Sequence, residues 1–161
     1  MTVAEYNKSV DDYSDGVYRF VLKNLKNEDK ARDVVQDTYE KLWIKVDEVA
    51  AEKVRSYLFA AAYHTMIDMI RKEKRLTGFE ADKHDCPTPA KPYTGLAQIM
   101  EEAVARLPED QRSVIMLRDY EGYSYEEIAA ITGLNESQVK VYIFRGRMFL
   151  KNYIGSIEAV I

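Results

Sequence analysis

Apolar residues recur every three or four positions along most of the chain, and this spacing constrains the fold more than any other feature. It places them on one side of an α-helix, whereas a half-buried strand needs strict alternation. The spacing predicts helices over residues 12–25, 30–46 and 53–75, and no stretch alternates with a period of two. We therefore expect an all-α protein.

Residues 77–95 interrupt this pattern, because they hold three of the four prolines, two of the seven glycines and few large aliphatic residues. Proline lacks an amide donor and pushes its neighbour out of helical geometry. We expect a flexible linker here, joining two small helical domains at residues 1–76 and 96–161. In the second domain, helical spacing resumes at Leu96, and Pro108 separates a first helix from a second.

The net charge is −4, yet two parts of the chain are basic. Residues 53–76 hold six basic and two acidic side chains, and residues 136–161 hold four and two. Two basic islands in an acidic chain indicate two contacts with a polyanion, although chance clustering on solvated helix faces gives the same pattern. With no membrane-length apolar run, no visible secretory signal and Cys86 as the one cysteine, we expect a cytoplasmic protein.

Residues 124–151 carry the features of a helix-turn-helix. Ser124 and Glu127 have the spacing of a capping box, so a helix should begin between them at Tyr125. Gly133 can end that helix in the left-handed conformation, and Asn135 can cap the next one. Such a unit places its second helix in a DNA major groove, while the alternative is an ordinary helical hairpin with a basic surface.

Three stretches resemble parts of the sigma-70 family of transcription initiation factors. Leu107 to Leu150 resembles region four, whose second helix reads the promoter −35 element. Ala31 to Trp43 resembles the part of region two that docks on RNA polymerase, and residues 54–75 resemble the part that melts and reads the −10 element. Two such domains with only a short linker between them are the layout of the extracytoplasmic-function group.

The resemblance implies a non-enzymatic initiation factor that binds core RNA polymerase, through its beta-prime clamp and beta subunit, and directs it to promoter DNA. Carried over position by position, it implies three sets of site residues. The polymerase-facing set is Asp33, Gln36, Asp37, Glu40 and Lys41. The set for the −10 element is Tyr63, His64, Asp68, Arg71, Lys72, Lys74 and Arg75. The set for the −35 element is Ser137, Gln138, Lys140, Val141, Phe144, Arg145 and Arg147.

Some positions add detail to this resemblance or depart from it. The loop at residues 47–53 falls where the family captures a flipped promoter base. The family commonly has Arg-Asn where this chain has Tyr63-His64, and often has arginine where it has Tyr142. These departures bear on which promoter bases are read. The resemblance also implies a membrane-associated anti-sigma factor that occludes both DNA-facing domains.

Two other function classes compete with this interpretation. A helix-turn-helix regulator that never contacts polymerase leaves the N-terminal pattern unexplained. An all-helical enzyme would need metal-binding carboxylates, for which the candidates are the pairs Asp11-Asp12, Glu28-Asp29 and Glu126-Glu127. Adjacent residues point to different helix faces, and charge at helix starts explains the pairs better. Neither His64 nor His84-Asp85-Cys86 has zinc-site spacing, so we expect no metal, cofactor or small-molecule substrate.

Overall fold

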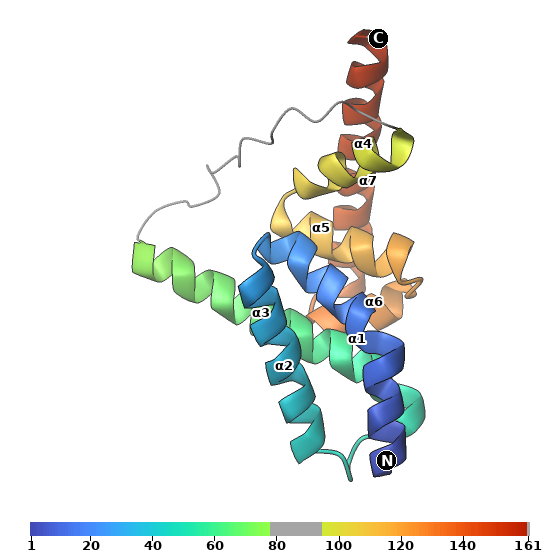
Figure 1. Cartoon of the computed structure of the whole chain (residues 1–161). Helices are drawn as coiled ribbons and strands as arrows, with labels where there is room; N and C mark the ends of the chain where they lie inside the picture. Colours follow the sequence, from blue (N-terminus) through green and yellow to red (C-terminus); the bar gives the residue numbers. More distant parts are fainter. Residues whose placement is uncertain (78–94, 161) are drawn as a thin grey trace.

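The computed structural model of the chain describes residues 1–77 and 95–160, and every regular element in these ranges is helical (Figure 1). The all-α expectation is therefore confirmed for the described part of the chain. The linker prediction falls almost entirely on residues 78–94, which lie outside the described residues. None of the described helices is both long and apolar enough to cross a bilayer.

The N-terminal domain packs three long helices around one core. These are α1 (Val3–Leu25), α2 (Glu28–Ile44) and α3 (Val54–Thr77), with a 3-10 turn, η1 (Ala51–Lys53), leading into α3. Each helix turns its apolar stripe inward, and five large apolar side chains on these stripes are fully buried. They are Phe20, Leu42, Leu58, Phe59 and Met66.

Side-chain caps explain where the first two helices begin. The Thr2 hydroxyl accepts from the Glu5 amide at 3.1 Å, and the Glu5 carboxylate accepts from the Thr2 amide at 2.8 Å. Asn27 caps α2 by accepting from the Lys30 amide. Because α1 begins at Val3, the Asp11-Asp12 pair lies within the helix, and explaining it as helix-start charge was wrong.

The C-terminal domain contains α4 (Leu96–Ala105), α5 (Glu109–Ile115), α6 (Tyr125–Thr132) and α7 (Glu136–Val160). One π-helical turn, η3 (Met116–Tyr120), prolongs α5. Helix α7 packs against the other three, and its C-terminal end projects beyond them (Figure 1). The core of this domain is built from Leu107, Ile115, Met116, Leu117, Ile128 and Ile143.

Helices α5 and α7 approach each other closely at Gly146. A Cβ added at Gly146 would lie 2.8 Å from Ile115 Cγ1 and 3.1 Å from Ile115 Cδ1. Gly155, further along the same helix, has nothing within 4 Å of the equivalent point. The absence of a side chain at residue 146 therefore sets the distance between the two helices.

Alanine at these two glycines should have opposite effects on stability. Gly146→Ala gains up to about 1 kcal/mol of helix propensity but overpacks the core, and we expect a net loss of about 1–2 kcal/mol. Gly155→Ala should gain propensity alone and stabilise the protein by up to about 1 kcal/mol. Urea unfolding followed by circular dichroism measures both, and a shift of the same sign in the two variants would contradict the packing described for Gly146.

The two domains lie against each other, with α3 on α6 and α1 on α5. At one end of the interface, Arg55 Nη2 donates to the backbone oxygen of Glu121 at 2.8 Å and forms an ion pair with its Oε1 at 3.1 Å. The same guanidinium lies 4.4 Å from the ring centroid of Tyr123. The Tyr123 ring in turn meets the buried Phe59 edge to face at 5.8 Å.

At the other end of the interface, the C-terminal ends of α1 and α4 meet. The buried Arg112 donates to backbone oxygens of Val104, Ala105 and Leu107 in its own domain and to that of Asn24 in the other. Lys26 Nζ donates to the Ala105 oxygen at 2.9 Å. The last carbonyl groups of both helices thus accept hydrogen bonds from Arg112 and Lys26. Burial lowers the pKa of Arg112, and a nearby Glu109 partly offsets this effect.

Candidate nucleic-acid interface

Local sequence accounts for the helix-turn-helix at residues 124–151. Ser124 and Glu127 form the reciprocal capping box at the start of α6, with hydrogen bonds of 3.1 and 2.9 Å. Gly133 ends α6 with a φ of 80°, a value at which a Cβ would be strained. Asn135 and Gln138 exchange a second pair of cap hydrogen bonds at the start of α7. Each of these features was predicted from the sequence.

Helix α7 has one buried and one exposed side. Val139, Ile143, Gly146 and Leu150 are buried against the rest of the domain. The seven residues predicted to contact the −35 element all lie on the exposed part of the helix, namely Ser137, Gln138, Lys140, Val141, Phe144, Arg145 and Arg147. The structure therefore brings them together on one accessible surface.

Three polar members of this set already have partners within the chain. Gln138 Oε1 accepts from the Asn135 amide in the helix cap. Lys140 Nζ lies 3.9 Å from Glu136 Oε1, and Arg147 Nη2 lies 2.7 Å from Asp119 Oδ1. The bond to Asp119 raises the pKa of Arg147. These ion pairs are solvent-exposed and weak, so a stronger anion can replace the carboxylates.

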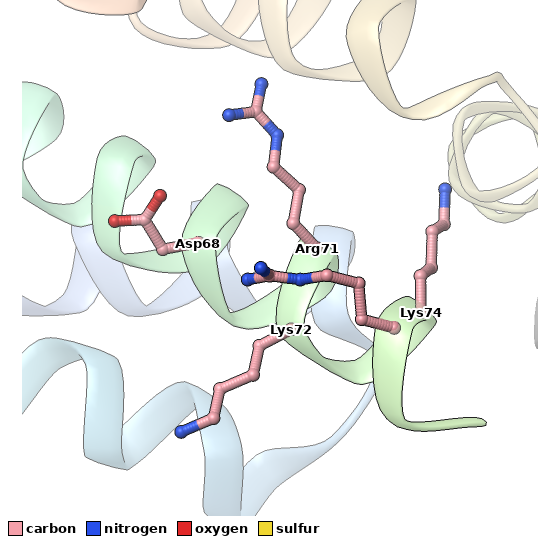
Figure 2. A pocket seen from close by; sticks show the side chains of 5 residues that line it. Asp68, Arg71, Lys72 and Lys74 are labelled. Atoms are coloured by element: carbon pink, nitrogen blue, oxygen red, sulfur yellow. The ribbon is translucent and has the colours of Figure 1, made fainter. Parts of the chain in front are cut away.

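A second basic surface occupies the last turns of α3. The exposed residues Asp68, Arg71, Lys72, Lys74 and Arg75 line an open depression there, and Figure 2 shows the labelled cationic side chains extending in different directions from the helix. Glu73, between them, forms a hydrogen-bonded ion pair with Lys30 of α2. Cations at a helix C-terminus are favoured by the helix dipole and offer contacts to phosphate.

Tyr63 and His64, also predicted to contact the −10 element, lie against the C-terminal domain. Tyr63 is 8 % exposed. Burial raises its pKa, as do Glu109 and Asp110 of the other domain, while Arg71 lowers it. His64 is exposed, but its Cε1 lies 3.9 Å from the point where a Cβ at Gly133 would be. In this arrangement the middle of α3 meets the turn of the helix-turn-helix, and the ring of Tyr63 does not face solvent.

The predicted polymerase-facing residues form a stripe along the outer face of α2. Asp33, Gln36, Glu40 and Lys41 are exposed, and Asp37 is half-buried. Lys41 Nζ forms an ion pair with Asp37 at 3.1 Å and donates to Thr65 of α3 at 2.9 Å. The stripe thus combines acidic side chains that point into solvent with a polar link that fixes its position on the domain.

The structure adds exposed apolar residues that the sequence prediction left out. Ile44 is 80 % exposed and continues the α2 stripe, and Trp43 beside it is about half exposed. Met148 continues the exposed line of Val141 and Phe144 on α7. Large apolar side chains at positions that break the inward-facing pattern were the signal in the sequence.

No cluster of metal-ligating side chains occurs in residues 1–77 and 95–160. His84-Asp85-Cys86 lies outside the described residues.

A capped helix-turn-helix together with a separate basic helix end is typical of a DNA-binding protein, here built on two domains whose described elements are all helical. Residues 10–76 match the family described as Sigma-70 region 2, and residues 97–150 match Sigma-70, region 4. The chain therefore belongs to the sigma-70 family, in its extracytoplasmic-function group, and is a promoter-specific transcription initiation factor. Sigma factors bind core RNA polymerase and promoter DNA and are not themselves enzymes.

Individual proteins agree with this assignment. The chain is 29 % identical to the RNA polymerase sigma factor SigV of Bacillus subtilis, over 88 % of this chain and 86 % of that protein. It is 30 % identical to the sigma-E factor of Salmonella typhimurium, over 76 % of this chain and 72 % of that protein. The sigma factor RpoE of Bartonella quintana, solved with the anti-sigma factor NepR, is 26 % identical and superposes with a TM-score of 0.77, covering 95 % of this chain and 98 % of that one.

Proposed function

We propose that this chain binds core polymerase through the α2 stripe, reads the −10 element with α3 and reads the −35 element with α7. The observation that carries the proposal is the exposed side of α7. Helix caps and the Gly133 turn hold its first turns outward, where the second helix of a helix-turn-helix enters a major groove. We assign polymerase binding and reading of the −10 element to a domain of residues 1–76, and reading of the −35 element to a separate domain of residues 96–161.

The charge pattern supports separate roles for two helices of the N-terminal domain. The α2 stripe presents Asp33 and Glu40 to solvent, which suits a basic protein partner and repels DNA. By contrast, the positive charges of Arg71, Lys72 and Arg75 near the end of α3 suit a phosphate backbone. One domain can therefore hold polymerase on one helix and promoter DNA on another.

Promoter binding in this proposal requires the domains to separate. The −10 and −35 elements are about 25 base pairs apart, which is about 85 Å of B-form DNA at 3.4 Å per base pair. A compact chain of 161 residues has a radius of gyration of about 15 Å, and so a diameter of about 40 Å. The arrangement in Figure 1, with α3 against α6, is too short to contact both elements at once.

We further propose that an anti-sigma factor regulates this chain. The support is the likeness to Bartonella quintana RpoE, which was solved with the anti-sigma factor NepR. That the partner is membrane-associated rests on the family resemblance alone. A chain that works with core polymerase and promoter DNA acts in the cytoplasm, and we propose that location for it.

Run-off transcription with purified core polymerase tests the proposal directly. Adding the chain should produce transcripts with discrete start sites on genomic fragments, and sequencing those starts should reveal shared elements near −10 and −35. Core polymerase alone gives the background. If the chain binds the fragments but adds no discrete starts, it acts as a regulator that does not serve polymerase as a sigma factor.

A further inference from the structure

An uncharged line of side chains runs along α7 opposite its buried face. At about 100° per residue, positions 141 and 148 lie within about 15° of the point opposite Val139, Ile143 and Gly146, position 137 lies about 25° from it and position 144 about 45°. Ser137, Val141, Phe144 and Met148 occupy these positions, and we call this line the outer ridge of α7, with Arg145 about 55° to the other side of the opposite point. Val141 is 43 % exposed and Phe144 66 % exposed.

Basic and polar side chains flank the outer ridge on both sides. The helical angles place Lys140, Arg147 and Lys151 along one margin and Gln138 and Arg145 along the other. On the first margin, Lys140 and Arg147 contact Glu136 and Asp119, which lie outside the ridge. The surface is therefore an uncharged line, apolar at Val141, Phe144 and Met148, with Lys140, Arg147 and Lys151 on one margin and Arg145 on the other.

This layout matches the cross-section of a DNA major groove. Phosphates form the two walls of the groove and attract cations, whereas base edges form its floor. The one apolar group that base edges present there is the C5 methyl of thymine. A partner protein that packed an apolar helix on the ridge would gain little attraction from basic margins on both sides. A polyanion gains attraction from both.

We propose that Val141 and Phe144 recognise the methyl groups of thymines in the −35 element, while the flanking cations contact phosphate. The inference rests on the proposed reading of that element by α7 and names the chemistry of the reading. Val141 and Phe144 are three residues apart, or about 4.5 Å along the helix, compared with 3.4 Å per base pair. Their contacts therefore fall on one or two neighbouring base pairs. Met148 lies two turns from Val141, beyond the N-terminal turns that reach base edges in this motif.

Replacing thymine with deoxyuracil removes only the methyl group, and so tests the inference without changing the protein. Holoenzyme made from the full chain and core polymerase would be titrated onto promoter duplexes with single dT→dU changes across the −35 element. Burying one methyl group is worth about 0.8 kcal/mol, which is about a fourfold change in affinity. We expect that loss at one or two neighbouring thymines and none at the others.

Two variants separate base reading from phosphate contact. Phe144→Ala should bind the dT duplex more weakly but should no longer distinguish dT from dU at its position. Lys140→Ala, on the margin, should weaken binding to all duplexes alike, reduce the salt dependence and keep the dT preference. Both side chains are exposed, so neither change should unfold the domain.

The outcomes distinguish this inference from the proposed function. Promoter-directed transcription that is indifferent to every dT→dU change would overturn the reading of thymine methyl groups and leave the sigma-factor function intact. A preference for dT that survives in Phe144→Ala and Val141→Ala would also overturn it. If the wild-type chain directed no transcription from discrete starts, the proposed function and this inference would fall together.

Discussion

Reversing Asp33, Asp37 and Glu40 together to lysine is expected to abolish co-purification of the chain with core RNA polymerase. The three residues share the outer stripe of α2, and the reversal turns an acidic surface into a basic one. Losing interfacial charge pairs and adding repulsion should lower the affinity by at least about 100-fold, because one desolvated pair alone is worth about 2–5 kcal/mol. Binding assays with immobilised core polymerase measure the loss.

A matched variant controls for net charge. Asp11, Asp15 and Glu48 are exposed elsewhere on the same domain, so reversing them changes the charge equally without touching the stripe. This variant should bind core polymerase with an affinity within a few-fold of wild type. Far-ultraviolet circular dichroism should be unchanged in both, because the Asp37–Lys41 pair that is lost is half exposed and such pairs add little to stability. Equal binding by the two variants would show that another surface contacts polymerase.

Elements that depend on local chemistry could be predicted from the sequence. The turn between α6 and α7 needs only Ser124, Glu127, Gly133 and Asn135, all within twelve residues, and the structure has it as expected. The N-terminus carries the same kind of local signal. Thr2 and Glu5 form a capping box, and α1 begins nine residues before the predicted helix.

The packing of one domain on the other could not be predicted in this way. Arg55 meets Glu121 and Arg112 meets Asn24 across 66 and 88 residues of sequence. Arg112 is buried against backbone carbonyl oxygens, which every residue has. No acidic side chain in the sequence could therefore have indicated its partners. Tyr63 shows the consequence. Its spacing and the family resemblance both allow a DNA contact, yet long-range packing buries it in this arrangement.

The domain interface offers a second large effect, because charge reversal at both of its ends should open the protein. Arg55→Glu places a carboxylate beside Glu121 and removes the contact with the Tyr123 ring. Lys26→Glu places another beside the carbonyl end of α4. We expect about 2 kcal/mol from the first change, which is partly exposed, and about 1 kcal/mol from the second. Together they shift the ratio of closed to open molecules by about 100-fold.

Small-angle X-ray scattering should detect this opening as a rise in the radius of gyration from about 15 Å to about 20 Å, which is the value for two domains of about 11 Å each with their centres about 33 Å apart. The charge swap Arg55→Glu with Glu121→Arg restores an ion pair at one end of the interface and should return the protein to the compact value. If the chain reads the −10 and −35 elements as proposed, promoter binding requires separated domains, and the open variant should also reach half-maximal transcription at a lower concentration, in proportion to its larger open fraction. An unchanged radius in the Arg55→Glu, Lys26→Glu variant would mean that the contacts left intact, among them Phe59 with Tyr123 and Arg112 with Asn24, suffice to hold the domains together.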